Sequence, residues 1–346
     1  MDKQLFRDTD RLFVSYFKSF IDKSTSVVLT GHKSPDDDCV ASLLTLYTYL
    51  KDYLGYEKEV RMIITGQEQT RWSYFKYFEH IEFVDDLADE ITEKNTLVLL
   101  DGSQWFRFSN KEEIKSFKGT SVCIDHHVSS GNNFSLSLIA PQYSSNTEIL
   151  YKLFFVKESI TKELAETMLM GILGDTGNFR YINHENSGVL SIAERLMKAG
   201  EVNIQLLESK YRGVDKKILP VFREYLKNTN FIRVEGWPLI AYSYISKSFI
   251  EKNSDLIVNQ TKFLVLNYLE NFRGVDCFFI VRPNEEYTRI SIRSKGDLDV
   301  NKIMEDLKIG GGHKNAAGGV IKGSPRKMIS LMKKYFSKNP FFVSED

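Results

Sequence analysis

In the first part of the sequence, short apolar runs alternate with segments whose apolar residues have the spacing of a helix. Several of the short runs stop abruptly at polar residues. A short continuous apolar run is typical of a buried strand, whereas apolar positions three or four residues apart are typical of a helix. Strands that alternate with helices predict parallel pairing with helical crossovers, which is a doubly wound α/β sheet. The strands are predicted at 27–30, 60–65, 96–100 and 121–124, and helices at 10–21 and 39–54.

The chain is long enough for two domains, because 346 residues exceed the usual size of one. Helical periodicity dominates residues 147–199, and strand-like runs return after a mixed stretch. We therefore expect a catalytic domain at 1–200, a linker or hinge at 201–235 and a smaller α/β domain at 236–346, with a cleft between the two domains. The strands of the second domain are predicted at 238–245, 277–282 and 288–293.

The charge balance limits the classes of partner. Lys plus Arg equals Asp plus Glu at 46 each, so the chain lacks the overall positive field that proteins binding long nucleic acid usually display. A small anionic substrate remains compatible, since a local site can be positive on a neutral protein. No apolar run is long enough to span a membrane and the N-terminal segment is charged, which favours a cytoplasmic protein. Three cysteines without a CxxC pair argue against a disulfide framework or a zinc ribbon.

The first candidate site is the loop GHKSPDDD, which follows the first predicted strand and carries His32, Asp36 and Asp38. Carboxylates close in sequence repel one another, and a bound cation relieves that repulsion. Mixed carboxylate and imidazole ligands suit manganese, iron or zinc better than calcium. The alternative is an acidic loop that caps the following helix. Cys39, directly after the loop, is expected to be a buried packing residue that could sense a bound metal.

Further carboxylates and imidazoles follow the other strands, where a doubly wound sheet gathers its functional groups. Asp101 directly follows a predicted strand, although a turn or helix-capping aspartate explains it equally well when it is taken alone. Asp125, His126 and His127 offer a metal ligand beside an acid, a base or a phosphate contact; the alternative is a pair of plain loop histidines. Asp175 lies between glycines at a helix break, which suits close approach to a ligand or a simple turn.

Taken together, these positions supply enough ligands for two metal ions that share a bridging carboxylate. Two ions roughly 3.5–4 Å apart can hold a bridging hydroxide as nucleophile and stabilise the attacking and leaving oxygens of a phosphoryl displacement. The sequence therefore predicts hydrolysis of a phosphate ester with two divalent ions, for which manganese, iron and zinc are the candidates.

The same motifs resemble the DHH phosphoesterase superfamily, whose name comes from a triplet that reads Asp125-His126-His127 in this chain. The resemblance covers nearly the whole chain, through GHKSPDDD, LLDG, DHH and GDTG and then RS at 293–294 and GGGHKNAAG at 310–318. The implied metal ligands are carboxylates and imidazoles of the first domain: His32 and Asp36 on one manganese ion, Asp38, His126 and Asp175 on the other, and Asp101 bridging both. Asp101 and His127 would be the catalytic residues, with His127 on the phosphate or the leaving group, and Asp125 would orient a histidine.

In the second domain, the resemblance implies a surface that binds the substrate. The backbone amides of Gly310, Gly311 and Gly312 would bind phosphate. Hydrogen bonds to the substrate would come from the side chains of His313, Arg293 and Ser294. From the residues alone, a flexible glycine loop and an ordinary solvated arginine are the alternatives.

The first motif departs from the pattern of many superfamily members at two positions. Asp37 and Ala41 stand where those members have glycine. Asp37 is therefore expected to lean into solvent or to perturb the loop, while the expected ligands on either side of it remain in place.

The domain pair resembles stand-alone members that degrade very short RNA, dephosphorylate 3'-phosphoadenosine 5'-phosphate, or hydrolyse cyclic di-AMP and its linear product pApA. We therefore expect a phosphodiesterase or phosphatase of small nucleotides that depends on two Mn²⁺ ions. The alternatives are an inorganic pyrophosphatase or polyphosphatase, and a nucleotide- or RNA-binding module without turnover. The sequence does not rank the nucleotides, the direction of attack or the oligomeric state, for which a homodimer is one option.

Overall fold

The computed structural model describes residues 3–127, 133–253, 261–284 and 286–341. The chain divides into two compact units, Met1–Gly213 and Val214–Asp346. The predicted linker contains α6 (Ile204–Tyr211) in the first unit, and a turn of 3₁₀ helix (Lys216–Ile218), α7 (Leu219–Lys227) and β7 (Asn230–Ile232) in the second. The structure thus divides this stretch between the units, and its role as a hinge stays a prediction. No helix among the described residues is long and apolar enough to cross a membrane.

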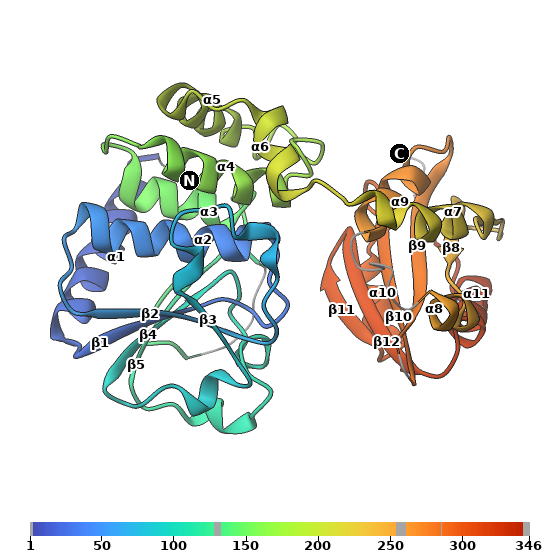
Figure 1. Ribbon diagram of the computed structural model, residues 1–346, viewed down its shortest axis with the longest axis horizontal. Helices are drawn as coiled ribbons and strands as arrows, with labels where there is room; N and C mark the ends of the chain where they lie inside the picture. Colours follow the sequence, from blue (N-terminus) through green and yellow to red (C-terminus); the bar gives the residue numbers. More distant parts are fainter. Residues whose placement is uncertain (1–2, 128–132, 254–260, 285, 342–346) are drawn as a thin grey trace. The chain divides into compact units, whose positions relative to one another are not determined.

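The first unit contains a six-stranded parallel sheet in the order β3-β2-β1-β4-β5-β6 (Figure 1). Its strands are β1 (Ser26–Thr30), β2 (Glu59–Thr65), β3 (Ile81–Val84), β4 (Asn95–Leu100), β5 (Thr120–Asp125) and β6 (Leu136–Ile139). The predicted α/β class with a mainly parallel sheet is confirmed. The chain winds outward from β1 in both directions, so the strand order reverses between β1 and β4. In sheets of this kind, ligands bind at that reversal, beyond the carboxyl ends of the strands.

The central strands β1, β4 and β5 are buried on both faces, which explains their continuous apolar runs. One face packs under the helices α1 (Lys3–Lys23), α2 (Asp37–Thr48), α3 (Asn146–Leu150) and α4 (Lys162–Asp175), and Val27 and Leu29 belong to this core. The opposite face carries Val28 and is covered by Trp105, Phe108 and other side chains from short turns of 3₁₀ helix. The α-helices therefore cover one face, and shorter segments cover the other.

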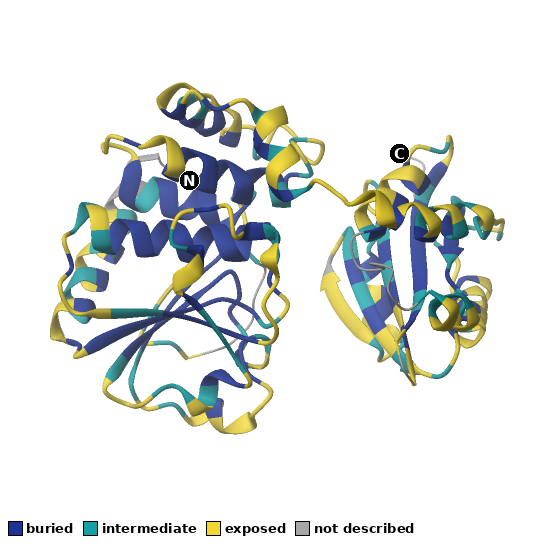
Figure 2. Ribbon diagram, in the orientation of Figure 1, coloured by how far each residue is buried: buried dark blue, intermediate teal, exposed yellow. Residues whose placement is uncertain are grey.

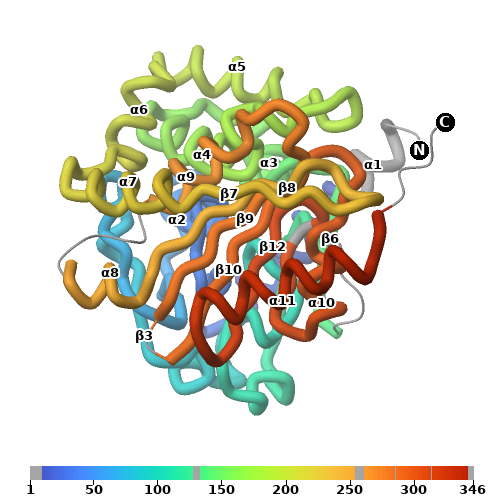
Figure 3. The backbone as a smooth tube through the Cα atoms, turned by 90° about the vertical axis from the view of Figure 1, so that its right-hand side faces the viewer, coloured from blue at the N-terminus to red at the C-terminus, as the bar shows by residue number. Residues whose placement is uncertain are grey.

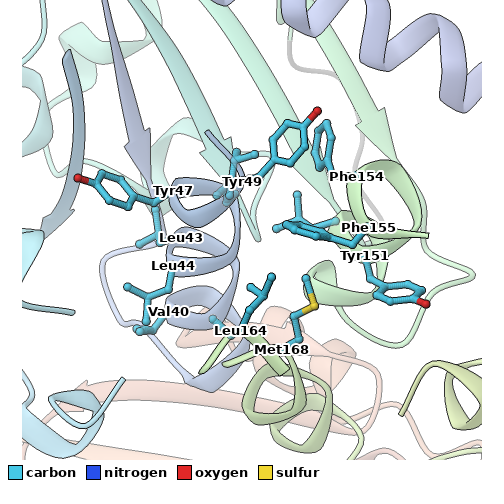
Figure 4. Close-up of a cluster of buried hydrophobic side chains, with 14 of the residues drawn as sticks. Val40, Leu43, Leu44, Tyr47, Tyr49, Tyr151, Phe154, Phe155, Leu164 and Met168 are labelled. Atoms are coloured by element: carbon cyan, nitrogen blue, oxygen red, sulfur yellow. The ribbon is translucent and has the colours of Figure 1, made fainter. Parts of the chain in front are cut away.

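Helix α2 is buried on every side, because the sheet lies on one side of it and α3 and α4 lie on the other (Figure 2). The sequence predicts one helix over 39–54, whereas the structure changes to a π-helical turn at Tyr49–Tyr53. A second π-helical turn, Tyr151–Phe155, follows α3. The two turns meet through aromatic rings, with Tyr49 and Phe154 at a centroid distance of 4.4 Å (Figure 4). The wider turns point these rings into the core, which apolar spacing alone does not predict.

Glycines in α4 bring the end of that helix close to the start of α2. A Cβ atom at Gly171 would lie 2.8 Å from an Asp38 carboxylate oxygen, and one at Gly174 would lie 2.7 Å from the Asp37 Cβ. A larger residue at either position would force the helices apart. The close packing delivers Asp175, the last residue of α4, to the region where α2 begins. The first unit continues with α5 (Val189–Gly200) and α6.

The second unit is also α/β, with a mixed sheet in the order β11-β12-β10-β9-β8-β7 (Figure 3). Its other strands are β8 (Leu239–Tyr244), β9 (Val275–Asn284), β10 (Tyr287–Ser294), β11 (Gly310–His313) and β12 (Ala316–Lys322). Neighbours pair antiparallel except β8 and β9. Helices α10 (Val300–Asp306) and α11 (Pro325–Lys338) pack on one face, and α7 and α9 (Thr261–Glu270) pack on the other. A short helix, α8 (Lys247–Lys252), follows β8.

A buried carboxylate, Asp86, joins the end of β3 to the loop after β4. It accepts hydrogen bonds from the Ser109 hydroxyl, from the Asn110 amide at 2.7 Å and from the Ala88 amide at 3.0 Å. Burial alone would raise the pKa of the Asp86 carboxyl, but these hydrogen bonds outweigh burial and lower that pKa. The carboxylate form is therefore the one that stabilises the fold.

We expect Asp86→Asn to lower the free energy of unfolding by roughly 1–3 kcal/mol at pH 7, because the amide leaves buried donors unsatisfied. Since the folded pKa lies below the unfolded pKa, the stabilisation by the wild-type carboxylate is present above pH ~4 and is lost as the pH falls through the folded pKa. Urea unfolding at pH 7, 5 and 3 measures this. Asp85→Asn, at the exposed neighbouring aspartate, is the matched control. A wild-type-to-variant difference that does not shrink on acidification would contradict the assignment.

Candidate metal centre

The candidate residues of the first unit meet at the carboxyl ends of three neighbouring strands. His32 follows β1, Asp101 follows β4, and Asp125 ends β5 directly before His126 and His127. Strands β1 and β4 are hydrogen-bonded neighbours, and β5 is the next strand in the sheet. These side chains lie beside the point at which the strand order reverses. The starts of α2 and α3 and the end of α4 complete the site.

Asp101 lies at the middle of this group. Its Oδ2 is 3.5 Å from Nε2 of His32, and its Oδ1 is 3.4 Å from Nε2 of His126 and 3.6 Å from Nδ1 of His127. The two oxygens face different histidines, which is the arrangement a bridging carboxylate needs. The backbone of Asp101 has a φ of 58° and its amide donates to the Ile124 carbonyl at 3.1 Å. A left-handed backbone at a non-glycine residue is strained, and such strain is concentrated at functional sites.

A second group of ligand atoms surrounds His126. Oδ2 of Asp175 is 3.0 Å from His126 Nε2, and Oδ2 of Asp38 is 4.0 Å from it. Asp38 is fully buried and accepts hydrogen bonds from the amides of Asn146, at 2.6 Å, and Thr147, at 3.0 Å. Those amides belong to the first turn of α3, where donors without an intrahelical partner favour an anion. The start of α3 therefore holds the Asp38 carboxylate in place.

Asp36 serves two purposes at the start of α2. Its Oδ1 accepts a hydrogen bond from the Cys39 amide at 3.1 Å, so it caps the helix, as the alternative interpretation of the loop predicts. Its Oδ2 lies 3.7 Å from His32 Nε2, and its side chain is 51% exposed. The cap therefore leaves one oxygen facing His32 at the rim of the site.

Asp125 is fully buried and contacts His127. Its Oδ1 accepts from the His127 amide at 3.1 Å and lies 2.6 Å from His127 Nδ1. Burial alone would raise the pKa of the Asp125 carboxyl, but the hydrogen bond and charge of His127 outweigh it and lower that pKa. This contact fixes the ring through Nδ1. The orienting role expected of Asp125 is compatible with this geometry and stays a prediction.

The electrostatics of the site indicate a missing positive charge. Burial and the neighbouring carboxylates raise the pKa of Asp38 well above its usual value, and burial raises the pKa of Asp175 to about 6. Burial alone would lower the pKa of His32, but the carboxylates of Asp101 and Asp36 outweigh it and raise that pKa to about 9. Nε2 of His32 and Oδ1 of Asp101 are buried without a hydrogen-bond partner among the described residues. Uncompensated buried carboxylates are costly, and a cation removes that cost.

The donor atoms fit a divalent metal. One group offers atoms within 4.8 Å of one another from Asp38, Asp101, His126 and Asp175, and another offers them from His32, Cys39 and Asp101. The two groups share Asp101, and carboxylate with imidazole is the donor set of manganese, iron and zinc sites. Cys39 is buried as expected, and burial raises the pKa of its thiol well above the usual value, so the thiol stays protonated.

Asp37 contradicts one of the two expectations for it, while the other, a perturbed loop, stays a prediction. It does not lean into solvent, since it is 6% exposed and its carboxylate contacts Trp72, Arg71 and Arg212. The sequence contains no spacing that links these residues, so the contact could be found only from the fold. Ala41, the other departure, is accommodated in the close packing of α2 against α4 at Gly171.

The substrate-binding candidates of the second unit take part in strand pairing and hydrogen bonds within that unit. Gly310, Gly311 and Gly312 form most of the edge strand β11, and a Cβ at Gly310 or Gly312 would lie 2.0 or 2.4 Å from a carbonyl oxygen of β12. The hydroxyl of Ser294 donates to the Leu298 carbonyl at 2.5 Å. Arg293 is partly buried and donates to the Ile292 carbonyl at 2.9 Å. The side chain of His313 lies outside what the structure describes. Substrate binding by all of these residues stays a prediction.

Comparison with known proteins gives two family matches, in the predicted order. The DHH family, N-terminal domain, matches residues 26–172, and the DHHA1 domain matches residues 242–338. Together they cover more than two thirds of the chain.

Among curated relatives, the bifunctional oligoribonuclease and PAP phosphatase NrnA of Thermus thermophilus is 27% identical over 299 residues, which are 86% of this chain and 84% of the relative. A probable manganese-dependent inorganic pyrophosphatase of Bacillus cytotoxicus is 34% identical over 165 residues, which are 44% of this chain and about half (49%) of the relative.

A solved structure shares the fold over almost the entire chain. It is an exopolyphosphatase-related protein from Bacteroides fragilis with a TM-score of 0.82 and 22% identity, covering 95% of this chain and 96% of that one. The two family matches, the order of their motifs and the gathering of those motifs at one edge of the sheet agree with one another. The chain therefore belongs to the DHH family of phosphoesterases.

Proposed function

We propose that this chain hydrolyses phosphate esters of small nucleotides, as a phosphodiesterase or phosphatase that depends on divalent metal ions. The substrates proposed are short oligoribonucleotides, pApA, cyclic di-AMP and 3'-phosphoadenosine 5'-phosphate. The observation that carries the proposal is the convergence of four metal-capable side chains, Asp38, Asp101, His126 and Asp175, at the edge of the parallel sheet. The similarity to NrnA, which extends over most of both chains, supports a nucleotide substrate.

Two ions, with manganese proposed, would be held as follows: His32 and Asp36 on one, Asp38, His126 and Asp175 on the other, and Asp101 on both. The two faces of Asp101, toward His32 and toward His126, support this division. The name of the manganese-dependent relative supports the choice of metal. When bound, such ions would supply Lewis acidity for the phosphoryl oxygens and an activated water as nucleophile.

Side chains and backbone amides of the chain would bind the phosphate and donate a hydrogen bond or a proton to the leaving group. With Nδ1 of His127 held by the buried Asp125, its Nε2 would face the phosphate and donate a hydrogen bond or a proton to the leaving oxygen. In the second unit, the amides of Gly310–Gly312 and the side chains of Arg293, Ser294 and His313 are proposed to bind the nucleotide.

An inorganic pyrophosphatase is the second candidate, because a probable pyrophosphatase shares 34% identity over part of this chain. That similarity covers 44% of the chain, whereas the similarity to NrnA covers 86%. This difference favours the nucleotide substrate.

A panel of substrates tests the proposed activity. We expect purified chain with Mn²⁺ to hydrolyse at least one of pApA, short RNA, cyclic di-AMP and 3'-phosphoadenosine 5'-phosphate at a higher kcat/KM than pyrophosphate. Product chromatography and phosphate release measure the rates, with heat-inactivated and metal-chelated protein as controls. If pyrophosphate is hydrolysed faster than all four nucleotides, the result would favour an inorganic pyrophosphatase.

The proposed bridging role of Asp101 predicts a large loss on substitution. Asp101→Asn should lower kcat by more than about 100-fold, because the loss of a direct ligand should exceed the 10–100-fold effect of residues that only support ligands. It should also weaken Mn²⁺ binding at both positions. Calorimetric titration and steady-state kinetics measure the two effects, with Asp85→Asn as a surface control. Wild-type Mn²⁺ stoichiometry and turnover in Asp101→Asn would exclude a bridging role.

Metal binding should release protons. In the metal-free protein the pKa of His32 is raised to about 9 and that of Asp175 to about 6, so part of the ligand set is protonated at neutral pH. A metal must displace these protons, and Mn²⁺ affinity should therefore rise between pH 5 and pH 9. Titration calorimetry in buffers of different ionisation enthalpy measures the number of protons released. Binding that is independent of both pH and buffer would contradict the protonation states described for the site.

A further inference from the structure

Asp37 is the centre of a polar cluster beside the proposed metal ligands. Its Oδ1 accepts from Trp72 Nε1 at 2.9 Å and lies 2.9 Å from a terminal nitrogen of Arg71. Its Oδ2 lies 3.1 Å from a terminal nitrogen of Arg212. We call Asp37, Arg71, Trp72 and Arg212 the Asp37 cluster. All four residues belong to the first unit.

The cluster turns a carboxylate away from the metal site and neutralises it. Asp37 stands between the proposed ligands Asp36 and Asp38, where an unpaired third carboxylate would add to the repulsion within the site. Two guanidinium groups pair with Asp37, and that of Arg212 also pairs with Glu208. The buried Asp37 carboxylate is therefore compensated by positive charge.

Arg212 connects this cluster to a second segment of the proposed site. Its NH1 nitrogen donates to Asn178 Oδ1 at 2.6 Å and to Glu208 Oε1 at 2.9 Å. Asn178 lies three residues after Asp175, in a turn where Gly177, Asn178 and Phe179 have φ values of 55°, 60° and 65°. Gly177 adopts this backbone freely, whereas Asn178 and Phe179 adopt it at a cost and need support from their surroundings. Arg212 supplies part of that support.

The two segments joined in this way both carry proposed metal ligands. Asp36 and Asp38 flank Asp37, and Asp175 precedes the strained turn. The backbone of α4 also approaches Asp37 closely, since a Cβ at Gly174 would lie 2.7 Å from the Asp37 Cβ. A shift of Arg212 would therefore change the position of Asp175 relative to Asp38. These carboxylates lie on either side of His126.

We infer that Asp37 and Arg212 are positioning residues of the metal centre, which hold the start of α2 and the turn after Asp175 at the spacing that metal binding requires. This inference rests on the proposed metal centre. It gives a role to the aspartate that stands where many superfamily members have glycine. The role belongs to the geometry of the ligands and is distinct from contact with the substrate.

Arg71 provides a matched comparison with Arg212. Both arginines pair with Asp37 and both side chains are 29% exposed, so the loss of either removes a similar ion pair. Arg71 contacts Asp37 and stacks over the Trp72 ring at 4.1 Å, whereas Arg212 contacts Asp37 and Asn178. Arg212 also pairs with Glu208, so the two substitutions can differ in stability. A cluster that serves stability alone would leave Mn²⁺ affinity alike in the two variants. A positioning role would respond more strongly to the loss of Arg212.

The test compares Mn²⁺ affinity in the full chain without substrate, by titration calorimetry, for wild type, Asp37→Asn, Arg212→Gln, Arg71→Gln and Asn178→Gly. Asn178→Gly tolerates the left-handed backbone and removes only the side chain that Arg212 contacts. We expect Asp37→Asn, Arg212→Gln and Asn178→Gly to weaken Mn²⁺ binding about 10–100-fold, the usual effect of residues that orient ligands. Arg71→Gln should weaken it distinctly less than Arg212→Gln. Urea unfolding of the metal-free variants separates an effect on affinity from an effect on stability.

Each result has a definite meaning. Equal Mn²⁺ affinity in wild type, Arg212→Gln and Asn178→Gly would overturn the inference, whatever the change in stability. Equal losses in Arg71→Gln and Arg212→Gln would also overturn it, in favour of a structural cluster. Failure of Asp37→Asn to fold would leave Asn178→Gly as the deciding variant. Absence of Mn²⁺ binding by the wild type would instead refute the proposed metal centre on which the inference rests.

Discussion

The electrostatic crowding of carboxylates around Asp101 is the constraint on which the rest of the site depends. Asp38 and Asp101 are buried and the Asp175 side chain is 20% exposed, and carboxylates gathered in this way cannot all remain ionised without a positive partner. The protein provides part of the compensation through the amides at the start of α3. The remaining deficit of positive charge is the physical reason to propose a pair of divalent ions.

The parallel sheet makes this crowding possible. Strands β1, β4 and β5 are neighbours and end at the same edge, so residues far apart in the sequence meet without a long loop. The rule that functional groups gather at the carboxyl ends of such strands was sufficient to predict this meeting from the sequence. Apolar runs interrupted by His32, Asp101 and Asp125 carry the information, because a strand buried on both faces has to be apolar until it ends.

Other features depend on contacts that a linear pattern does not contain. The burial of Asp37 requires Arg71 and Arg212, which lie 34 and 175 residues away in the chain, and no periodicity connects them. The π-helical turn after α2 depends on its aromatic contact with a similar turn after α3. In the second unit, a glycine that contacts phosphate and a glycine that allows tight strand pairing look alike in the sequence. The structure shows the tight pairing of β11 with β12.

The central claim is that two divalent ions share Asp101. Crystals of the chain grown with Mn²⁺ and measured at the manganese absorption edge test it most directly, because anomalous scattering locates the metal without reference to activity. A shared pair of ions predicts two anomalous peaks roughly 3.5–4 Å apart, with the Asp101 carboxylate between them. A single peak, or peaks away from Asp101, would contradict it.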